Sequence, residues 1–424
     1  MNAVKRIFTV LLSVAALSAL SAQAGQKQIV RTGIEVLEGR GFEGLVGKNV
    51  GLVTNPSGID HNLRSTIDIL HEAPGVNLKT LFAPEHGVRG DAYAGSHVED
   101  FKDPKTGIPV YSIYGSNRKP SKKMLEGLDI VVYDIQDIGS RSYTFISTLG
   151  LVMRACAENG IEVMVLDRPN PLGGNKIEGC LVEPGFHSFV SEFKIPYIYG
   201  LTVGELALLL NEEGLNCGEK GNEAPLKCRL SVIPMEGWTR NMLYQDTNLP
   251  WVLPSPNIPY PQSAVNYPSS GITGEFQGYL NIGIGYTLPF EVFAAEWIDA
   301  DALKALLDNY NLPGVAFRTI HFKPFSGSLQ GKLIHGVQFH YTDYEAACCT
   351  LTQFYVMQAV NELYPEKNPF ALSKGRNNMF DKVCGTDYVR TTFGKRLKVE
   401  DIADYWSKDV EAFRTLSRKY WLYN

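Results

Sequence analysis

The sequence predicts an α/β protein with a Rossmann-like open parallel sheet domain, followed by a smaller α+β domain. Short, continuous apolar runs alternate with helical periodicity, as expected when helices cover both faces of a parallel sheet. The connections between these runs are short enough for right-handed crossovers. After a proline-dense crossing the strands begin to alternate in polarity, which predicts a change of architecture.

The chain begins with a segment that is not expected to belong to the fold. Lys5 and Arg6 precede an apolar stretch at residues 7–20, and Ala22-Gln23-Ala24 forms a small-x-small cleavage site. This pattern is typical of a secretory signal peptide, so residues 1–24 predict export to the periplasm. No later stretch is long and apolar enough to span a bilayer, so no membrane insertion is expected after cleavage.

The first domain is predicted over residues 28–262. Strands are expected at residues 48–54, 78–82, 109–113, 129–133, 162–166 and 226–234. Helices are expected between them, at residues 65–72, 121–127, 144–158 and 202–213. Ser121 is a candidate N-cap, and Thr202 with Glu205 forms a capping box.

The second domain is predicted over residues 270–424. Residues 248–267 are dense in proline and are interpreted as an extended crossing between the domains. Beyond the crossing, strands are expected at residues 290–297, 317–322 and 333–341, and helices at 301–310, 346–363 and 399–416.

Composition and motifs exclude several function classes. The formal net charge is −5 and no basic block is present, which argues against nucleic acid as a partner. No G-x-G-x-x-G follows the first strand and no Walker loop is present, so no cofactor is expected. His61, His86 and His97 with Asp91 match no metal-ligand spacing, so no metal is expected. The oligomeric state stays open.

Two cysteines are candidates for a disulfide. Cys217 and Cys228 flank a polar, glycine-containing loop, and an exported chain meets an oxidising compartment. We therefore expect the two thiols to pair, although the sequence also allows both to stay reduced.

Polar loops follow four of the predicted strands, at residues 55–58, 84–95, 134–141 and 167–170. The carboxyl ends of parallel strands lie at one edge of a sheet, and ligands bind there. Glycoside hydrolysis commonly needs a protonated carboxylic acid and often a second carboxylate. Glu85 follows a buried strand and is the candidate acid, unless it merely pairs with Arg89 or His86. The candidates for the second carboxylate are Asp134, Asp137 and Glu178.

Further residues at this edge are candidates for binding a substrate. Arginine suits a substrate carboxylate because its planar fork binds bidentately, although Arg141 could instead pair with Asp137. Tyr143 is a candidate for stacking on a sugar ring, unless it belongs to the core. The full set of binding candidates is Asn55, His86, Arg89, Gln136, Arg141, Tyr143, Asp167, Arg168, Asn170 and Asn257.

Several long motifs resemble one known family. They are GLVTNPSGID, LFAPEHGVRGDAYAG, VVYDIQDIGSRSYTFISTL, VLDRPNPLGG, IPYIYGLTVGELA and LPWVLPSPNIPY. By these motifs the chain is similar to the NamZ-type exo-β-N-acetylmuramidases, a glycoside hydrolase family formerly catalogued as of unknown function. The resemblance covers nearly the whole chain after the leader. It implies a Rossmann-like domain followed by a smaller one, and release of N-acetylmuramic acid from the non-reducing end of peptidoglycan fragments. It also implies that Glu85, the glutamate of PEHG, is catalytic.

One segment departs from the family pattern. Family members typically carry Ser-Glu-Gly-Arg-Gly shortly before Pro-Phe-Glu, whereas here residues 281–285 read Asn-Ile-Gly-Ile-Gly before Pro289-Phe290-Glu291. The missing arginine leaves the exact amino sugar open, because muramic acid carries a lactyl carboxylate. Two alternatives remain: a periplasmic muropeptide-binding protein without catalysis, and a metal-dependent amidase or deacetylase.

Overall fold

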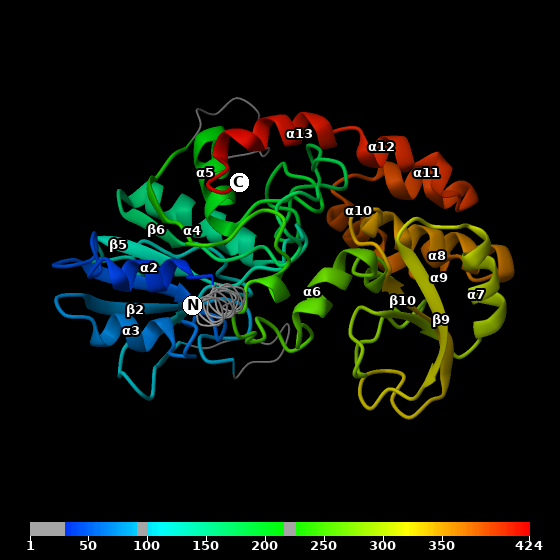
Figure 1. The fold of residues 1–424 in the computed structure, drawn as a ribbon, viewed down its shortest axis with the longest axis horizontal. Coiled ribbons are helices and arrows are strands. Elements are labelled where there is room, and N and C mark those ends of the chain that lie inside the picture. The colour runs from blue at the N-terminus through cyan, green and yellow to red at the C-terminus, as the bar shows by residue number, and fades with distance from the viewer. Residues whose placement is uncertain (1–29, 91–99, 216–225) are drawn as a thin grey trace, which may run out of the picture.

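Two sheets organise the computed structural model, which describes residues 30–90, 100–215 and 226–424 (Figure 1). The larger sheet has seven strands, formed by residues 49–233, and the smaller has three strands, formed by residues 292–341. The predicted fold class, an open α/β domain followed by a smaller domain, is confirmed. Cys217 lies outside the described residues, so its disulfide with Cys228 stays a prediction.

The larger sheet is parallel except at one edge. Its order is β3-β4-β2-β1-β5-β6-β7, and only the short edge strand β3 is antiparallel to its neighbour. The direction of winding reverses beside β1, which pairs with both β2 and β5. The strands are β1 Asn49–Thr54, β2 Asn77–Ala83, β3 Phe101–Lys102, β4 Pro109–Ser112, β5 Ile130–Asp134, β6 Glu162–Leu166 and β7 Arg229–Ile233.

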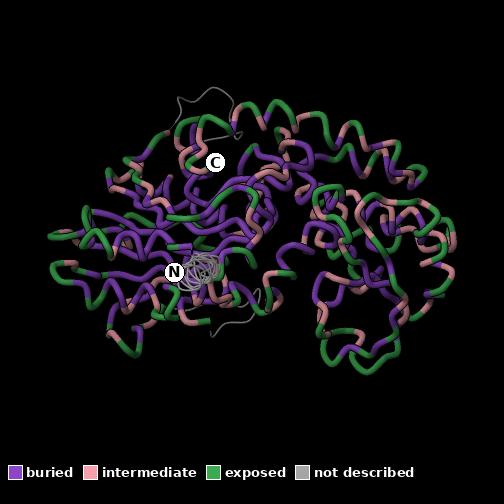
Figure 2. The backbone as a smooth tube through the Cα atoms, in the orientation of Figure 1, coloured by how far each residue is buried: buried purple, intermediate pink, exposed green. Residues whose placement is uncertain are grey.

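Helices bury both faces of this sheet. One face packs with α4 (Phe145–Asn159) and α5 (Val203–Glu213), and the other with α2 (Gly33–Gly39) and α3 (Thr66–Glu72). Neighbouring residues of one strand point to opposite faces: Val53 belongs to the first hydrophobic cluster and Leu52 to the second. This double burial explains the continuous apolar runs in the sequence. Buried residues accordingly follow the strands in Figure 2.

Local signals set the ends of three helices. Ser65 accepts a hydrogen bond from the Asp68 N–H at 3.1 Å, and the predicted Thr202–Glu205 capping box is present. Gly160 ends α4 at φ 68°, a left-handed conformation that favours glycine. The helix expected at residues 121–127 is wrong, because the segment forms only turns. Its Ser121 hydroxyl accepts from the Met124 N–H at 3.3 Å, as expected of an N-cap, but no helix follows.

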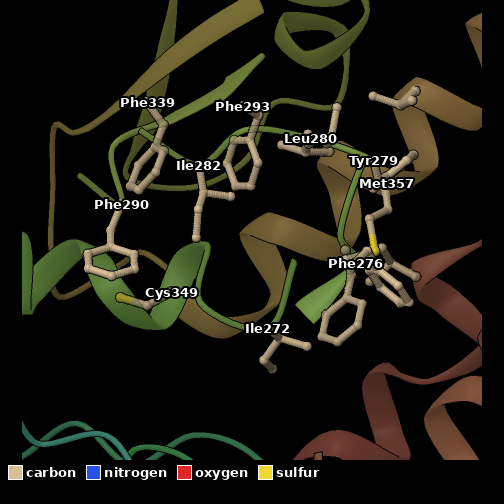
Figure 3. Close-up of a cluster of buried hydrophobic side chains, with 14 of the residues drawn as sticks. Ile272, Phe276, Tyr279, Leu280, Ile282, Phe290, Phe293, Phe339, Cys349 and Met357 are labelled. Carbon is tan, nitrogen blue, oxygen red and sulfur yellow. The ribbon is translucent and has the colours of Figure 1, made fainter. Parts of the chain in front are cut away.

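The smaller sheet is antiparallel and packs on helices. Its order is β8-β10-β9, formed by Val292–Ala295, Ile334–Tyr341 and Val315–Phe322. Figure 3 shows Phe293 and Phe339 of this sheet in one buried cluster with Met357 of α8 and Phe276. The helix expected at residues 399–416 is broken into three short helices: η5, α12 and α13.

The remaining helices connect or cover these layers. In chain order they are η1 Tyr244–Asp246, α6 Pro261–Asn266, η2 Tyr267–Ser269, η3 Thr273–Glu275, α7 Ala300–Asn309, α8 Cys349–Leu363, α9 Pro369–Leu372, η4 Lys374–Arg376, α10 Asn377–Cys384, α11 Tyr388–Arg396, η5 Val399–Asp401, α12 Ala403–Ser407, α13 Val410–Ser417 and η6 Arg418–Tyr420. In Figure 1, α6 lies in the crossing between the two sheets, and α13 returns beside α5. Phe413 of α13 is buried in a hydrophobic cluster of the first domain, so the two domains interlock.

Candidate active site

Loops from neighbouring strands meet at the carboxyl edge of the larger sheet. The Gln136 N–H, after β5, donates to Ser57 Oγ, after β1, at 2.9 Å. The Gln136 side chain donates to the Pro169 carbonyl, after β6, at 2.7 Å. Asn55 Nδ2 donates to the Pro254 carbonyl at 3.2 Å, which joins the proline-rich crossing to the same edge. These bonds assemble the loops into one site.

Two hydroxyl groups hold the Glu85 carboxylate. Tyr114 OH donates to Oε1 at 2.8 Å, and Thr144 Oγ1 donates to Oε2 at 2.9 Å. Thr144 is the N-cap residue of α4 and Tyr114 follows β4, so three loops meet at Glu85. A hydroxyl can accept as well as donate, so these partners can serve both the charged and the protonated carboxyl group. Glu85 is partly exposed, which leaves it open to a ligand.

A pocket of about 180 Å³ is lined by His86, the residue that follows Glu85 in the sequence. His86 is buried there at φ 75°, a strained conformation for a residue other than glycine. The walls come from two strand-end loops and from the crossing: Pro56, His86, Arg89, Gly90, Val252, Leu253, Pro254, Ser255 and Pro256. A larger hollow of about 570 Å³, at residues 122–128, lies at the opposite edge of the sheet, near the start of β5.

Aromatic residues line the boundary between the domains beside these loops. Tyr143 meets Phe145 and Tyr267 edge-on, with ring centroids 5.2 and 5.7 Å away. Burial raises the pKa of Tyr143 well above its usual value, and the nearby Tyr267, Glu85 and Asp137 add to that rise. The phenol therefore lies within the electrostatic influence of both carboxyl groups. Tyr143 is half-buried and packs with the interface, and its role as a stacking platform stays a prediction.

Asp137 combines burial with an uncommitted oxygen. Its Oδ2 accepts hydrogen bonds from the Gly139 N–H at 2.7 Å and from Tyr199 OH, whereas Oδ1 has no partner among the described residues. Burial raises its pKa to about 6, against the opposing effect of those donors. Such a carboxyl group can exchange a proton near neutral pH. Asp137 does not pair with Arg141, which points elsewhere.

Asp134 is held in a buried ion pair. The Arg168 guanidinium donates to both of its carboxylate oxygens, at 2.5 and 2.9 Å, and Thr66 donates as well. Arg168 also donates to the Ile59 carbonyl at 2.8 Å. Both charged side chains are nearly inaccessible to solvent. This geometry ties the loops after β1, β5 and β6 together and leaves neither group open to a substrate.

Glu178 and Arg141 join the two domains. Glu178 accepts from the backbone N–H groups of Cys349 and Thr350, at 3.0 and 2.7 Å, at the start of α8. The carboxylate thus satisfies unpaired donors at a helix N-terminus. Arg141 is fully buried and donates to four carbonyl oxygens, those of Cys180, Ile195, Val383 and Cys384. The structure therefore gives both candidates a structural position rather than one facing a ligand.

The remaining candidates divide between the pocket and the scaffold. Arg89 binds Asp103 with both ends of its fork, at 2.8 and 2.9 Å, which lowers the pKa of Asp103 to about 2. Asp167 accepts from four donors, namely two backbone N–H groups and the hydroxyls of Thr202 and Tyr423. Asn170 is buried and donates to the Leu201 carbonyl at 2.9 Å. Arg89, which lines the pocket, and Asn257, on the crossing, are both partly exposed.

Sequence reasoning missed the two hydroxyl partners of Glu85. Tyr114 follows β4, so the rule that placed the other loops at this edge also applied to it. Its strand is only four residues long, which made the signal weak. Thr144 looked like the first residue of a helix, and only the fold shows that its side chain turns toward the loop after β2.

The fold and the site define the class of protein first. A partly exposed glutamate between hydroxyl donors lies in the same loop cluster as a buried carboxyl group of raised pKa, and a pair of carboxyl groups is what glycoside hydrolases commonly use.

Comparison with known proteins then gives the family. The family models for the exo-β-N-acetylmuramidase NamZ match residues 50–262, by the N-terminal domain, and 265–423, by the C-terminal domain. The chain is 43% identical over 401 residues to the peptidoglycan β-N-acetylmuramidase NamZ of Bacillus subtilis (strain 168), covering 95% of this chain and 93% of that protein. The chain therefore belongs to the NamZ exo-β-N-acetylmuramidase family.

Two solved structures share the whole fold, both DUF1343 family proteins from Bacteroides fragilis NCTC 9343. One is 52% identical with a TM-score of 0.88, covering 94% of this chain and 100% of that chain. The other is 29% identical with a TM-score of 0.73, covering 93% and 99%. Within the described residues, no helix is both long and apolar enough to cross a membrane.

Proposed function

We propose that this protein is an exo-acting glycoside hydrolase that releases N-acetylmuramic acid, or a related amino sugar, from the non-reducing end of peptidoglycan fragments. The observation that carries the proposal is the Glu85 carboxyl group, held by Tyr114 and Thr144 at the carboxyl edge of the sheet. Membership of the NamZ family supports the same substrate class.

In this proposal Glu85 is the general acid. It donates a proton to the glycosidic oxygen as the bond to the anomeric carbon breaks, so the leaving sugar departs as a neutral alcohol. Tyr114 and Thr144 fix the plane of the carboxyl group and follow its change of protonation by rotating their hydroxyl hydrogens.

Asp137 is the proposed second carboxylate. Asp134 is neutralised by Arg168 and Glu178 is committed to α8, so neither has a free oxygen to offer. Asp137 keeps Oδ1 uncommitted and has a pKa of about 6. In its charged form it would stabilise the positive charge that develops on the sugar ring, or activate water.

The leader at residues 1–24 supports a periplasmic location for this activity. Peptidoglycan fragments occur in that compartment, so the enzyme and its substrate would meet there. This location remains a proposal, as does cleavage of the leader.

The direct test uses two disaccharides of opposite order. One has N-acetylmuramic acid at the non-reducing end linked to N-acetylglucosamine, and the other has the reverse order. We expect mass spectrometry to detect both free monosaccharides from the first disaccharide and none from the second. Calorimetric binding of the first disaccharide without any product would favour the non-catalytic muropeptide binder instead.

A further inference from the structure

The three arginines predicted from the sequence are all engaged with other residues of the chain, although Arg89 is partly exposed and lines the pocket. Arg89 pairs with Asp103, Arg168 is in a buried ion pair, and Arg141 donates to carbonyl groups at the domain junction. The segment at residues 281–285 adds no charge, and its Asn281 side chain closes the turn by bonding Gly283 N and Ile284 O at 2.7 and 3.0 Å. A carboxylate-bearing sugar would therefore need a cation from elsewhere.

Arg118 is connected to Glu85 by three successive contacts. Its guanidinium carbon lies 4.4 Å from the centre of the Phe189 ring. Phe189 in turn meets the ring of Tyr114 at 6.2 Å, and Tyr114 OH donates to Glu85 at 2.8 Å. Arg118 lies in the loop after β4, at the same edge of the sheet as the other site loops.

The guanidinium group of Arg118 is open to a ligand. The side chain is exposed, and it forms no ion pair or hydrogen bond with any residue in the described part of the chain. Its neighbour Lys119, in contrast, is neutralised by Glu158 at 2.7 Å. Stacking on the buried Phe189 ring holds the plane of the guanidinium and leaves its edge N–H groups free.

The charge of Arg118 also acts on the catalytic cluster. Burial and the hydrogen bond to Glu85 raise the pKa of Tyr114, and the positive charge of Arg118 opposes that rise. The same Tyr114 hydroxyl donates to Glu85 at 2.8 Å.

We propose that Arg118 binds the free carboxylate of the lactyl group on the sugar that Glu85 cleaves, and so selects muramic acid over glucosamine. This inference rests on the proposed function. The guanidinium fork matches a carboxylate with two parallel N–H···O bonds. Phe189 is the positioning residue, because its ring contacts both the Arg118 guanidinium and the Tyr114 ring.

The test compares substrates that differ only at the lactyl group. Nitrophenyl glycosides of N-acetylmuramic acid, of its lactyl methyl ester and of N-acetylglucosamine keep the same sugar ring and leaving group. For Arg118→Met we expect KM for the acid to rise about tenfold with kcat nearly unchanged, because the lost contact acts in binding. The preference for the acid over the methyl ester should disappear. Arg118→Lys, which keeps the charge but not the fork, should retain part of it.

Lys119→Met is the matched control, because it removes an adjacent cation that is already paired with Glu158. It should leave all three KM values unchanged. The inference is overturned if Arg118→Met keeps the wild-type ratio of acid to ester, or if Lys119→Met changes that ratio as much. If the wild type hydrolyses none of these glycosides, the proposed function fails. Calorimetry with free N-acetylmuramic acid then tests Arg118 separately: equal affinity of the wild type and Arg118→Met would overturn it.

Discussion

Glu85 and Asp137 are held by different kinds of partner, and this difference underlies the roles that we propose for them. Glu85 is partly exposed and has two hydroxyl partners that can reverse their hydrogen bonds. Asp137 is buried, and two donors fix one of its oxygens while the other stays uncommitted. The raised pKa of Asp137 follows from burial without a cation.

We predict that Asp137→Asn lowers kcat about a hundredfold with little change in KM, because the amide cannot carry the negative charge that stabilises the transition state. Steady-state kinetics check the expected fall in kcat. They are measured at a temperature where circular dichroism shows that the variant is folded. Asp167→Asn is the matched control, because Asp167 is equally buried and its pKa is also raised, to about 7, but four donors occupy it. A similar fall in kcat for both variants would contradict a specific role for Asp137.

At the scale of the elements, strands deliver the site loops and two buried side chains fasten the domains. The order β4-β2-β1-β5-β6 places the loops after these five strands side by side. Glu178 ties the second domain to the first by occupying the N-terminus of α8, and Arg141 does so through the last carbonyl groups of α10. Both residues thus fix the second domain against the first without contacting the proposed site themselves.

We predict that Glu178→Gln lowers the free energy of unfolding by about 1–2 kcal/mol, because the N-terminus of α8 loses its negative partner. Once folded, the variant should keep its kcat, since Glu178 contacts α8 and not the site. Urea unfolding checks the expected loss of stability, and steady-state kinetics on the same preparation check that kcat is unchanged. A stable variant with a hundredfold lower kcat would restore Glu178 as a catalytic candidate.

The sequence predicted the strands of the parallel sheet and the edge where the loops meet, because continuous apolar runs and helix caps are local signals. It did not predict the fates of Arg141, Arg168 and Glu178. Their partners lie 34 to 243 residues away, so no local pattern announces them. The broken helix at residues 399–416 has a similar cause, since Phe413 turns back to the core of the first domain.

At the scale of the whole molecule, buried carboxyl groups set how stability responds to pH. Burial raises the pKa of Asp137 to about 6 and that of Asp167 to about 7, from 3.8. Their stabilising contribution is complete below pH 3.8 and is lost as the pH rises through these values. Asp103 acts in the opposite sense, because Arg89 lowers its pKa to about 2. Its contribution is present above pH 3.8 and is lost as the pH falls toward 2.

We therefore predict that these three groups make the free energy of unfolding highest near pH 4 and lower it progressively up to about pH 7. Urea unfolding at a series of pH values checks this. Asp137→Asn should flatten the fall between pH 4 and 6 by up to about 3 kcal/mol, the equivalent of its pKa shift. Stability that rises steadily from pH 5 to pH 8 would contradict the assignment of these buried acids.

The central claim is that Glu85 protonates the leaving group, and Glu85→Gln tests it most directly with two substrates. The disaccharide releases N-acetylglucosamine, a poor leaving group that needs a proton, whereas a dinitrophenyl muramide releases dinitrophenolate, which departs readily without one. We predict that Glu85→Gln lowers kcat/KM about a thousandfold for the disaccharide but less than about tenfold for the dinitrophenyl glycoside. Glu178→Gln is the control, because it makes the same Glu-to-Gln change away from the proposed site and is expected to keep its kcat. Equal losses on both substrates, or full activity on the disaccharide, would contradict the claim.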